Sequence, residues 1–295
     1  MSAGRVSVVV APIVSLALAL SGCAGESPGP VPQWSASQSP PIPGPSTRSA
    51  SASLAPASTT PTGRESSRST GELTAATLTR VRAARLFFGH QSVGYNVMKG
   101  INLLSRKLGV RAPNYVNVQA GESLPVGDLG FLAHAKVGRN GYPLQKLEAF
   151  EKLVRGGMGG RLDAALVKLC YVDFNSKTDP AKVFRAYRKV MSRLEKDYPQ
   201  VTFVYATVPL EVKADQANAI RTRFNQLIRV EYGKTGRLWD IAAAESTDPN
   251  GNRVGGKRYE SLYADYSNDG AHLNETGAVV VAEPLLSILA LSVTP

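Results

Sequence analysis

The sequence predicts an α/β domain with three layers, in which helices cover both faces of a mainly parallel sheet. From about residue 72 onward, short apolar segments alternate with longer segments of helical periodicity. Two of the short segments, 163–171 and 201–208, are almost continuously apolar, as expected of strands buried on both faces. Alternation of this kind favours parallel strands joined by crossover helices. The roughly 225 residues involved suit a single domain.

The expected elements follow from the apolar pattern. Helices are expected at 73–84, 95–107, 143–154, 180–197, 214–232 and 276–291. Strands are expected at 85–88, 115–119, 163–171, 201–208 and 237–241. Pro143 suits the first turn of its helix, and Asp179-Pro180 combines a capping residue with a first-turn proline. In a parallel sheet of this kind, functional sites lie beyond the carboxyl ends of the strands.

The first 22 residues have the features of an export signal. Arg5 supplies a positive charge, and Val6–Leu20 is an apolar stretch of about 15 residues, shorter than the ~20 that a transmembrane helix needs. The stretch ends in Leu20-Ser21-Gly22-Cys23, which resembles the bacterial lipobox, whose cysteine becomes the lipidated first residue. The alternative is an ordinary signal peptide with a cysteine near its cleavage site. We expect an exported protein anchored through Cys23 to the outer face of the cell membrane.

Residues 23–71 are expected to form a disordered tether between this anchor and a domain over 72–295. They are rich in Pro, Ser, Thr, Gly and Ala, and Trp34 and Leu54 are exceptions. Such a composition buries too little apolar surface to offset the entropy of ordering. A flexible chain of about 48 residues has an r.m.s. reach of roughly 40 Å.

Cysteine content and charge restrict the remaining possibilities. The chain has two cysteines; lipidation of Cys23 leaves no intramolecular disulfide, and Cys170 is expected to be a buried thiol. The formal net charge of +11 comes largely from helices such as 181–196 and 218–229. It indicates either solvated helix faces or attraction to anionic envelope polymers or lipid head groups. Export and this distribution argue against nucleic acid. We expect a monomer without metal or cofactor, since the three histidines form no ligand cluster.

Three segments next to predicted strand ends carry residues capable of chemistry. In Gly89-His90-Gln91-Ser92-Val93-Gly94, Ser92 lies between a strand and a helix N-terminus and is either a nucleophile or an N-cap. In Asp269-Gly270-Ala271-His272, an Asp three residues before a His is able to hold the imidazole; the alternative is an Asp-Gly turn and a chance His. In 168–175, Asp173 either lines a site or closes the strand in an Asx turn.

Together these segments resemble the SGNH, or GDSL-type, hydrolase family over about residues 86–291, which implies a flavodoxin-like sheet. The strongest match is Trp239-Asp240-Ile241 followed by Asp269-Gly270-Ala271-His272-Leu273-Asn274-Glu275-Thr276-Gly277. The resemblance implies Ser92 as nucleophile, His272 as base and Asp269 as the acid that orients it.

The chain departs from the family pattern in two blocks. His90-Gln91-Ser92 stands where the family has Gly-Asp-Ser, and Val172 stands where the third block has its oxyanion-binding asparagine. In the segment 138–141, Gly138, Asn140 and Gly141 are candidate replacements for the donors to the oxyanion.

The sequence thus predicts a serine esterase that deacylates, and more specifically deacetylates, a cell-envelope or extracellular glycan. Gln91 and Asp173 are expected to line its pocket. Two alternatives remain open: a glycan-binding lipoprotein with this fold but impaired catalysis, and an acyltransferase that uses the same triad.

Overall fold

The structure is a computed structural model that describes residues 73–120, 123–127 and 129–293. The chain divides into two compact units, 1–63 and 64–295, and all described residues belong to the second. The predicted signal peptide, Cys23 and the tether lie outside the described residues, so these predictions stay predictions.

A six-stranded parallel sheet forms the centre of the second unit. Its strands are β1 (Arg85–His90), β2 (Tyr115–Asn117), β3 (Phe131–Lys136), β4 (Ala164–Val167), β5 (Thr202–Ala206) and β6 (Leu238–Trp239). They lie in the order β2-β3-β1-β4-β5-β6, and every neighbouring pair is parallel. Without the edge strand β2 this is the flavodoxin-like order, with the first strand second from the edge. The predicted fold class is confirmed.

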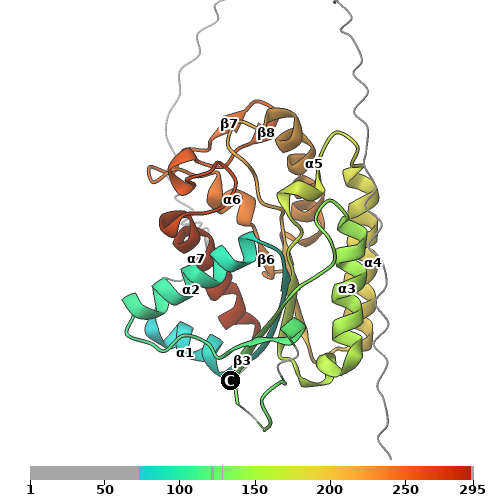
Figure 1. Ribbon diagram of the computed structural model, residues 1–295, viewed down its shortest axis with the longest axis vertical. Helices are drawn as coiled ribbons and strands as arrows, with labels where there is room; N and C mark the ends of the chain where they lie inside the picture. The colour runs from blue at the N-terminus through green and yellow to red at the C-terminus, as the bar shows by residue number, and fades with distance from the viewer. Residues whose placement is uncertain (1–72, 121–122, 128, 294–295) are drawn as a thin grey trace, which may run out of the picture. The chain divides into compact units, whose positions relative to one another are not determined.

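Helices cover both faces of the sheet (Figure 1). One face carries α1 (Ala75–Ala83), α2 (Val93–Lys107), α6 (Ile241–Glu245) and α7 (Glu275–Ser292). The other carries α3 (Pro143–Leu153), α4 (Pro180–Asp197) and α5 (Asp215–Tyr232). Each face has its own apolar cluster against the sheet, as a three-layer fold requires. A small antiparallel pair, β7 (Gly255–Gly256) and β8 (Tyr259–Glu260), completes the regular elements discussed below.

The predicted helix starts have the expected local causes. Pro143 occupies the first turn of α3. The Asp179 carboxylate caps α4 by accepting the amides of Ala181 and Lys182 at 2.9 and 3.2 Å. These bonds satisfy two of the amide groups that a helix N-terminus leaves without intrahelical partners.

One strand of the parallel sheet, the short helix α6 and the small β7–β8 pair were not expected from the sequence. β3 lies inside the sheet, between β1 and β2, although its sequence Phe131-Leu132-Ala133-His134-Ala135-Lys136 contains no β-branched residue. The short helix α6 follows β6 directly. The strand expected over 163–171 is also shorter, because β4 ends at Val167 and a 3₁₀ turn occupies 171–173.

The helices α2 and α7 cross in close contact. A Cβ atom at Gly100 would lie 2.1 Å from the carbonyl oxygen of Ala278, so only glycine permits this approach. By length and hydropathy α7 is apolar enough to cross a membrane, but half of its residues are buried against neighbouring elements. It has the burial of a core helix, and it carries at its N-terminus the loop that contains His272.

Candidate active site

The first candidate residue, Ser92, follows β1, an interior strand of the sheet. It opens α2 with φ −32° and ψ −59° and is half-buried. Ser92 occupies the N-cap position of α2, but its side chain makes no capping hydrogen bond. The turn is tied to the segment after β3, because Gln91 Nε2 donates to the carbonyl oxygens of Val137 and Gly138, each at 2.9 Å. Gln91 therefore positions the turn.

The second candidate segment brings Asp269 and His272 together as the sequence predicted. The Asp269 Oδ2 atom lies 2.8 Å from His272 Nδ1. Its Oδ1 atom accepts the backbone amides of His272 at 2.7 Å and Ala271 at 2.9 Å. These amides, and then the His272 side chain, hold the pKa of Asp269 well below its usual range. An ionised Asp269 only accepts, so His272 Nδ1 carries the proton and Nε2 keeps the lone pair that a general base needs.

The loop around this pair is fixed by its own hydrogen bonds. Ser267 Oγ donates to the His272 carbonyl at 2.6 Å and accepts the amide of Gly270 at 2.9 Å. The Gly270 carbonyl in turn accepts the amide of Val212, in the segment after β5, at 2.8 Å. Gly270 has a φ of 84°, which glycine adopts without strain. The orientation of His272 is thus largely set by the fold.

His272 reaches the edge of the sheet from which Ser92 also projects. Its ring packs edge-on against Tyr171, shortly after β4, with 6.0 Å between the ring centroids. β4 pairs with β1, the strand before Ser92. Within the described part of the chain, Ser92 Oγ and His272 are not hydrogen-bonded to each other; such contacts are often loose without substrate. The triad Ser92, Asp269, His272 therefore stays a prediction.

Asp173 does not line the pocket, contrary to the prediction. Its side chain is wholly buried and forms an ion pair with the equally buried Lys146, at 2.7 and 2.8 Å. Its oxygens also accept the amides of Cys170 at 2.7 Å and Gly141 at 2.9 Å. All of its acceptor capacity is used to join the segments that follow β3 and β4.

These bonds also decide which oxyanion donors remain. The Gly141 amide is engaged by Asp173, so it is not available to an oxyanion and its prediction as a donor is wrong. Asn140 Oδ1 accepts from Lys146 Nζ at 2.9 Å, which leaves the Asn140 amide nitrogen without a partner among the described residues. The Gly138 amide likewise has no acceptor there. Gly138 and Asn140 keep their place as candidates.

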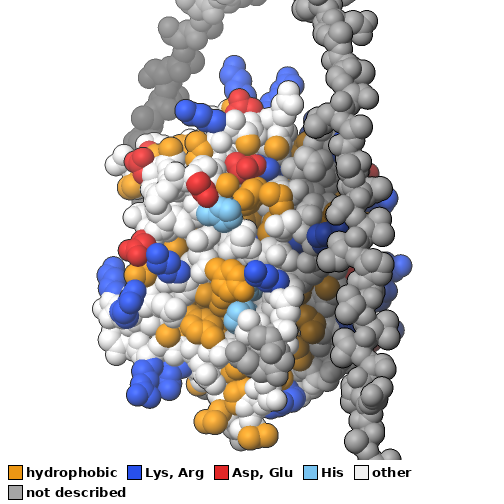
Figure 2. Space-filling model, viewed as in Figure 1, with side chains coloured by type: hydrophobic (Ala, Val, Ile, Leu, Met, Phe, Trp, Pro, Cys, Tyr) orange, Lys and Arg blue, Asp and Glu red, His pale blue; other side chains and the backbone are white. Residues whose placement is uncertain are grey.

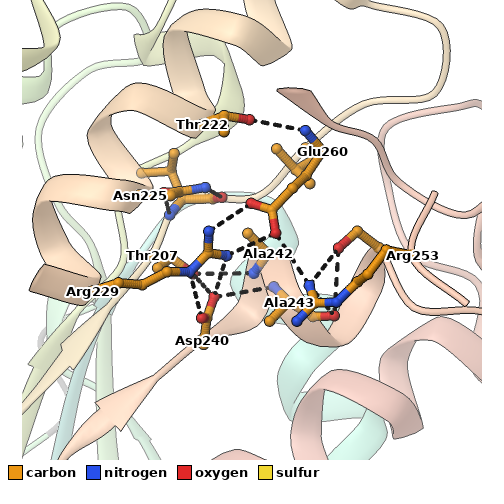
Figure 3. Close-up of polar contacts among 12 residues, drawn as sticks. Thr207, Thr222, Asn225, Arg229, Asp240, Ala242, Ala243, Arg253 and Glu260 are labelled. Atoms are coloured by element: carbon orange, nitrogen blue, oxygen red, sulfur yellow. Dashed lines mark hydrogen bonds and ion pairs between the residues drawn. The ribbon is translucent and has the colours of Figure 1, made fainter. Parts of the chain in front are cut away.

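A third carboxylate at this edge, Asp240, has a structural role (Figure 3). It follows β6, caps α6 through the amide of Ala243 at 3.0 Å, and pairs with Arg229 at 2.6 Å. Arg229 bonds Glu260 of β8 at 2.8 Å as well, and Glu260 also pairs with Arg253. The cluster ties α5, β6, α6 and β8 together. Asp240 is thus held by a structural arginine, whereas the more exposed Asp269 is paired with a histidine.

Three buried ionisable groups near the site were given no role by the sequence analysis. His90 and Lys168 are wholly buried, and Glu245 on α6 is almost wholly buried. Burial raises the pKa of Glu245 to about 8, although the Leu210 amide and nearby cations act in the opposite direction. Cys170 is a buried free thiol, as predicted. Arg221, within the basic helix segment 218–229, is buried and pairs with Glu211, so it contributes to neither a solvated face nor an exposed basic surface.

Two tyrosine rings are exposed on the elements that frame Ser92. Tyr95, in the first turn of α2, is 41% exposed, and Tyr142, after β3, is 45% exposed. Each has a cation over its ring: Lys136 Nζ lies 5.5 Å from the Tyr95 centroid, and Arg139 Cζ lies 3.8 Å from that of Tyr142. Figure 2 shows a molecular face on which histidine side chains reach the surface beside hydrophobic and basic ones.

No protein-family model and no curated protein matches this chain. Several solved structures are similar to it. A family 3 carbohydrate esterase from Clostridium thermocellum has 14% identity and a TM-score of 0.42, over 68% of this chain and 92% of that one. A family 3 carbohydrate esterase from Talaromyces cellulolyticus has 15% and 0.40, over 68% and 94%. A lipase/acylhydrolase from Enterococcus faecalis has 11% and 0.42, over 72% and 98%. At such low identity, the activity of this chain has to follow from its own residues.

Proposed function

We propose that this chain is an exported serine ester hydrolase of the SGNH type that deacylates a glycan. The carrying observation is the Asp269–His272 pair, joined at 2.8 Å in an exposed loop. The His272 ring packs on Tyr171, shortly after the strand that pairs with β1. An Asp that fixes the Nδ1–H tautomer of a His leaves Nε2 as base, which is the arrangement that activates a serine hydroxyl.

The reaction proceeds in two halves. Ser92 Oγ attacks the ester carbonyl while its proton moves to His272 Nε2, and the carbonyl electrons move onto oxygen. The oxyanion collapses, the C–O bond to the sugar breaks, and His272 protonates the leaving alkoxide. Water then attacks the acyl-Ser92 ester with His272 again as base, which releases the acid and restores Ser92. The Ser92 and Gly138 amides and Asn140 are the proposed oxyanion donors.

A glycan substrate is supported by the exposed rings of Tyr95 and Tyr142. An aromatic face in water offers an apolar surface against which the C–H face of a sugar ring packs. The adjacent Lys136 and Arg139 favour anionic sugars. We propose acetyl as the acyl group.

The test is hydrolysis by the full chain of p-nitrophenyl acetate and of acetylated oligosaccharides, with fluorophosphonate labelling. We expect turnover, a label on Ser92, and a loss of at least about 10³-fold in kcat in Ser92→Ala and in His272→Ala. Ser176→Ala, at an exposed loop serine after β4, is the matched control and should retain full activity. An inert wild type that is also not labelled, or an active Ser92→Ala variant, contradicts the proposal.

A glycan-binding protein without turnover is the second candidate, and the observation that favours it is Val172 in the place of an oxyanion asparagine. Glycan binding by a chain that is inert to esters and to fluorophosphonate supports this candidate. Acyl transfer to a sugar acceptor in excess of hydrolysis indicates a transferase with the same triad instead.

We also propose the anchoring of the chain at the outer face of the membrane through Cys23. It is supported by Leu20-Ser21-Gly22-Cys23 at the end of the apolar stretch. Cells that express the full chain and are fed an alkyne fatty acid should label it, and Cys23→Ser should abolish the label. A wild-type chain without label contradicts the anchor and leaves the esterase proposal unaffected.

A further inference from the structure

A pair of histidines lies directly behind the turn that carries Ser92. His90 is the last residue of β1, and its ring is wholly buried. Its Nδ1 atom lies 3.0 Å from the carbonyl oxygen of Gln91, and its Nε2 atom lies 3.2 Å from Nδ1 of His134 on β3. The proposed mechanism assigns neither histidine a role.

The partners of His90 define its protonation. A carbonyl oxygen only accepts hydrogen bonds, so His90 Nδ1 must carry the proton in the bond to Gln91. Burial lowers the pKa of His90 to about 3, against the opposing effect of the Gln91 bond and with help from Lys168, His134 and Lys136. The ring is therefore neutral near pH 7, Nε2 has only a lone pair, and His134 Nδ1–H donates to it.

The bond from His90 fixes the orientation of the peptide unit between Gln91 and Ser92. The Gln91 carbonyl accepts a second hydrogen bond from the Gly94 amide at 2.7 Å, so two donors hold it. In a planar trans peptide the N–H points opposite to the C=O. The Ser92 N–H therefore points away from His90 and from the first turn of α2. No residue in the described part of the chain accepts it.

The His90 ring has little freedom to move. Phe88 and Tyr95 pack on it, with ring centroids 4.8 and 4.9 Å away. A Cβ atom at position 94 would lie 2.3 Å from the ring, so Gly94 is required for the ring to occupy this place. Side chains locked by packing in this way position their neighbours accurately.

We propose that His90, held in its tautomer by His134, is a positioning residue that presents the Ser92 N–H as a preformed donor to the reaction oxyanion. The role rests on the proposed function, because an oxyanion forms only if Ser92 attacks a carbonyl. In this role His90 transfers no proton. Its neutral ring fixes the plane of the Gln91–Ser92 peptide through hydrogen bonds alone.

The first test reads the tautomer without any turnover. In the ¹⁵N-histidine NMR spectrum of the full chain, His90 should show a protonated Nδ1 and a bare Nε2, unchanged between pH 5 and 9. The His90 signal is assigned by its loss in His90→Phe. If His90→Phe does not fold, the signal is assigned by its shift in His134→Phe. A protonated Nε2, or titration in this range, overturns the proposal even if the protein is an esterase.

The second test uses substitutions at both histidines. His90→Phe and His134→Phe keep a ring but remove the hydrogen bonds, and we expect kcat for an aryl ester to fall about 10- to 100-fold with KM unchanged. His134→Gln, whose amide still donates, should recover most of kcat. Tyr115→Phe, which removes a part-buried hydroxyl on β2, is the control and should have no effect. A folded His90→Phe variant with wild-type kcat overturns the proposal for His90. The esterase proposal is tested separately, by the loss of kcat in Ser92→Ala.

Discussion

Asp173 and Asp269 are two aspartates at the same edge of the sheet with opposite surroundings. Asp173 is wholly buried, and its oxygens accept from the Lys146 ammonium and two backbone amides. Asp269 has a side chain 55% exposed, and one of its oxygens is bound to an imidazole that is itself 41% exposed. The bonds of Asp173 join two loops, whereas the partner of Asp269 is a histidine, the side chain that most often serves as general acid or base. Both carboxylates lie beyond strand ends. What distinguishes the structural one from the candidate functional one is the residue that each binds, Lys146 or His272.

The largest expected effect comes from neutralising the exposed aspartate. Asp269→Asn keeps an oxygen for the backbone amides but no longer stabilises the Nδ1–H tautomer of His272. We expect kcat to fall about 10⁴-fold, with little change in stability because the side chain is exposed. Steady-state kinetics and urea denaturation measure the two quantities. A loss of less than tenfold removes Asp269 from the mechanism.

Asp173→Asn should show the reverse profile. It leaves Lys146 buried without a charged partner, and breaking such a pair costs about 3–5 kcal/mol of unfolding free energy. The double variant Lys146→Met/Asp173→Asn removes both charges and should recover part of this loss. Urea denaturation measures all three chains. If the single variant is as stable as the wild type, the pair does not hold the two loops together.

The buried Glu245 extends the comparison to pH. Its pKa is about 8 in the folded chain and near 4.5 when exposed, so the folded state binds the proton more tightly. Its contribution to the unfolding free energy is therefore complete below about pH 4.5 and is lost as pH rises to about 8. Glu245→Gln should remove this loss and stabilise the protein at pH 8.5 by on the order of 3 kcal/mol.

The matched control for Glu245 is Glu148→Gln, at an exposed position of α3. Urea denaturation at pH 5 and 8.5 should give the same pH dependence for this variant as for the wild type. If Glu245→Gln shows that same dependence too, another group is responsible for it.

The smallest effect is expected at the crossing of α2 and α7. Gly100→Ala places a methyl group against the Ala278 carbonyl, so one helix must shift. We expect the free energy of unfolding to fall by about 2 kcal/mol. Gly160→Ala, where the added carbon meets no atom within 4 Å, is the control. Equal thermal midpoints for the two variants contradict the close approach.

The sequence predicted what local patterns determine. Apolar periodicity located most helices and strands, and the three-residue spacing of Asp269 and His272 was sufficient to predict their contact. β3 escaped because Ala133, Ala135 and Lys136 are weak strand formers; its state depends on pairing with β1 and β2, which are distant in sequence.

The misplaced site residues share one cause. The burial of Asp173 depends on Lys146, which the sequence presents as an ordinary basic position of a helix. The engagement of the Gly141 amide follows from the same contact. Interactions of this kind depend on how loops and helices meet in space, so neither apolar periodicity nor motif spacing predicts them.

The crossing of α2 and α7 has a mechanical consequence for the candidate triad. Ser92 opens one helix eight residues before Gly100. His272 lies three residues before the first residue of the other helix, which meets Gly100 at Ala278. At about 1.5 Å of rise per residue, Ser92 lies roughly 12 Å from the crossing point. A relative rotation of about 10° there displaces an arm of that length by about 2 Å, enough to separate a nucleophile from its base. The angle between two packed helices thus bears directly on the alignment of the two proposed catalytic groups.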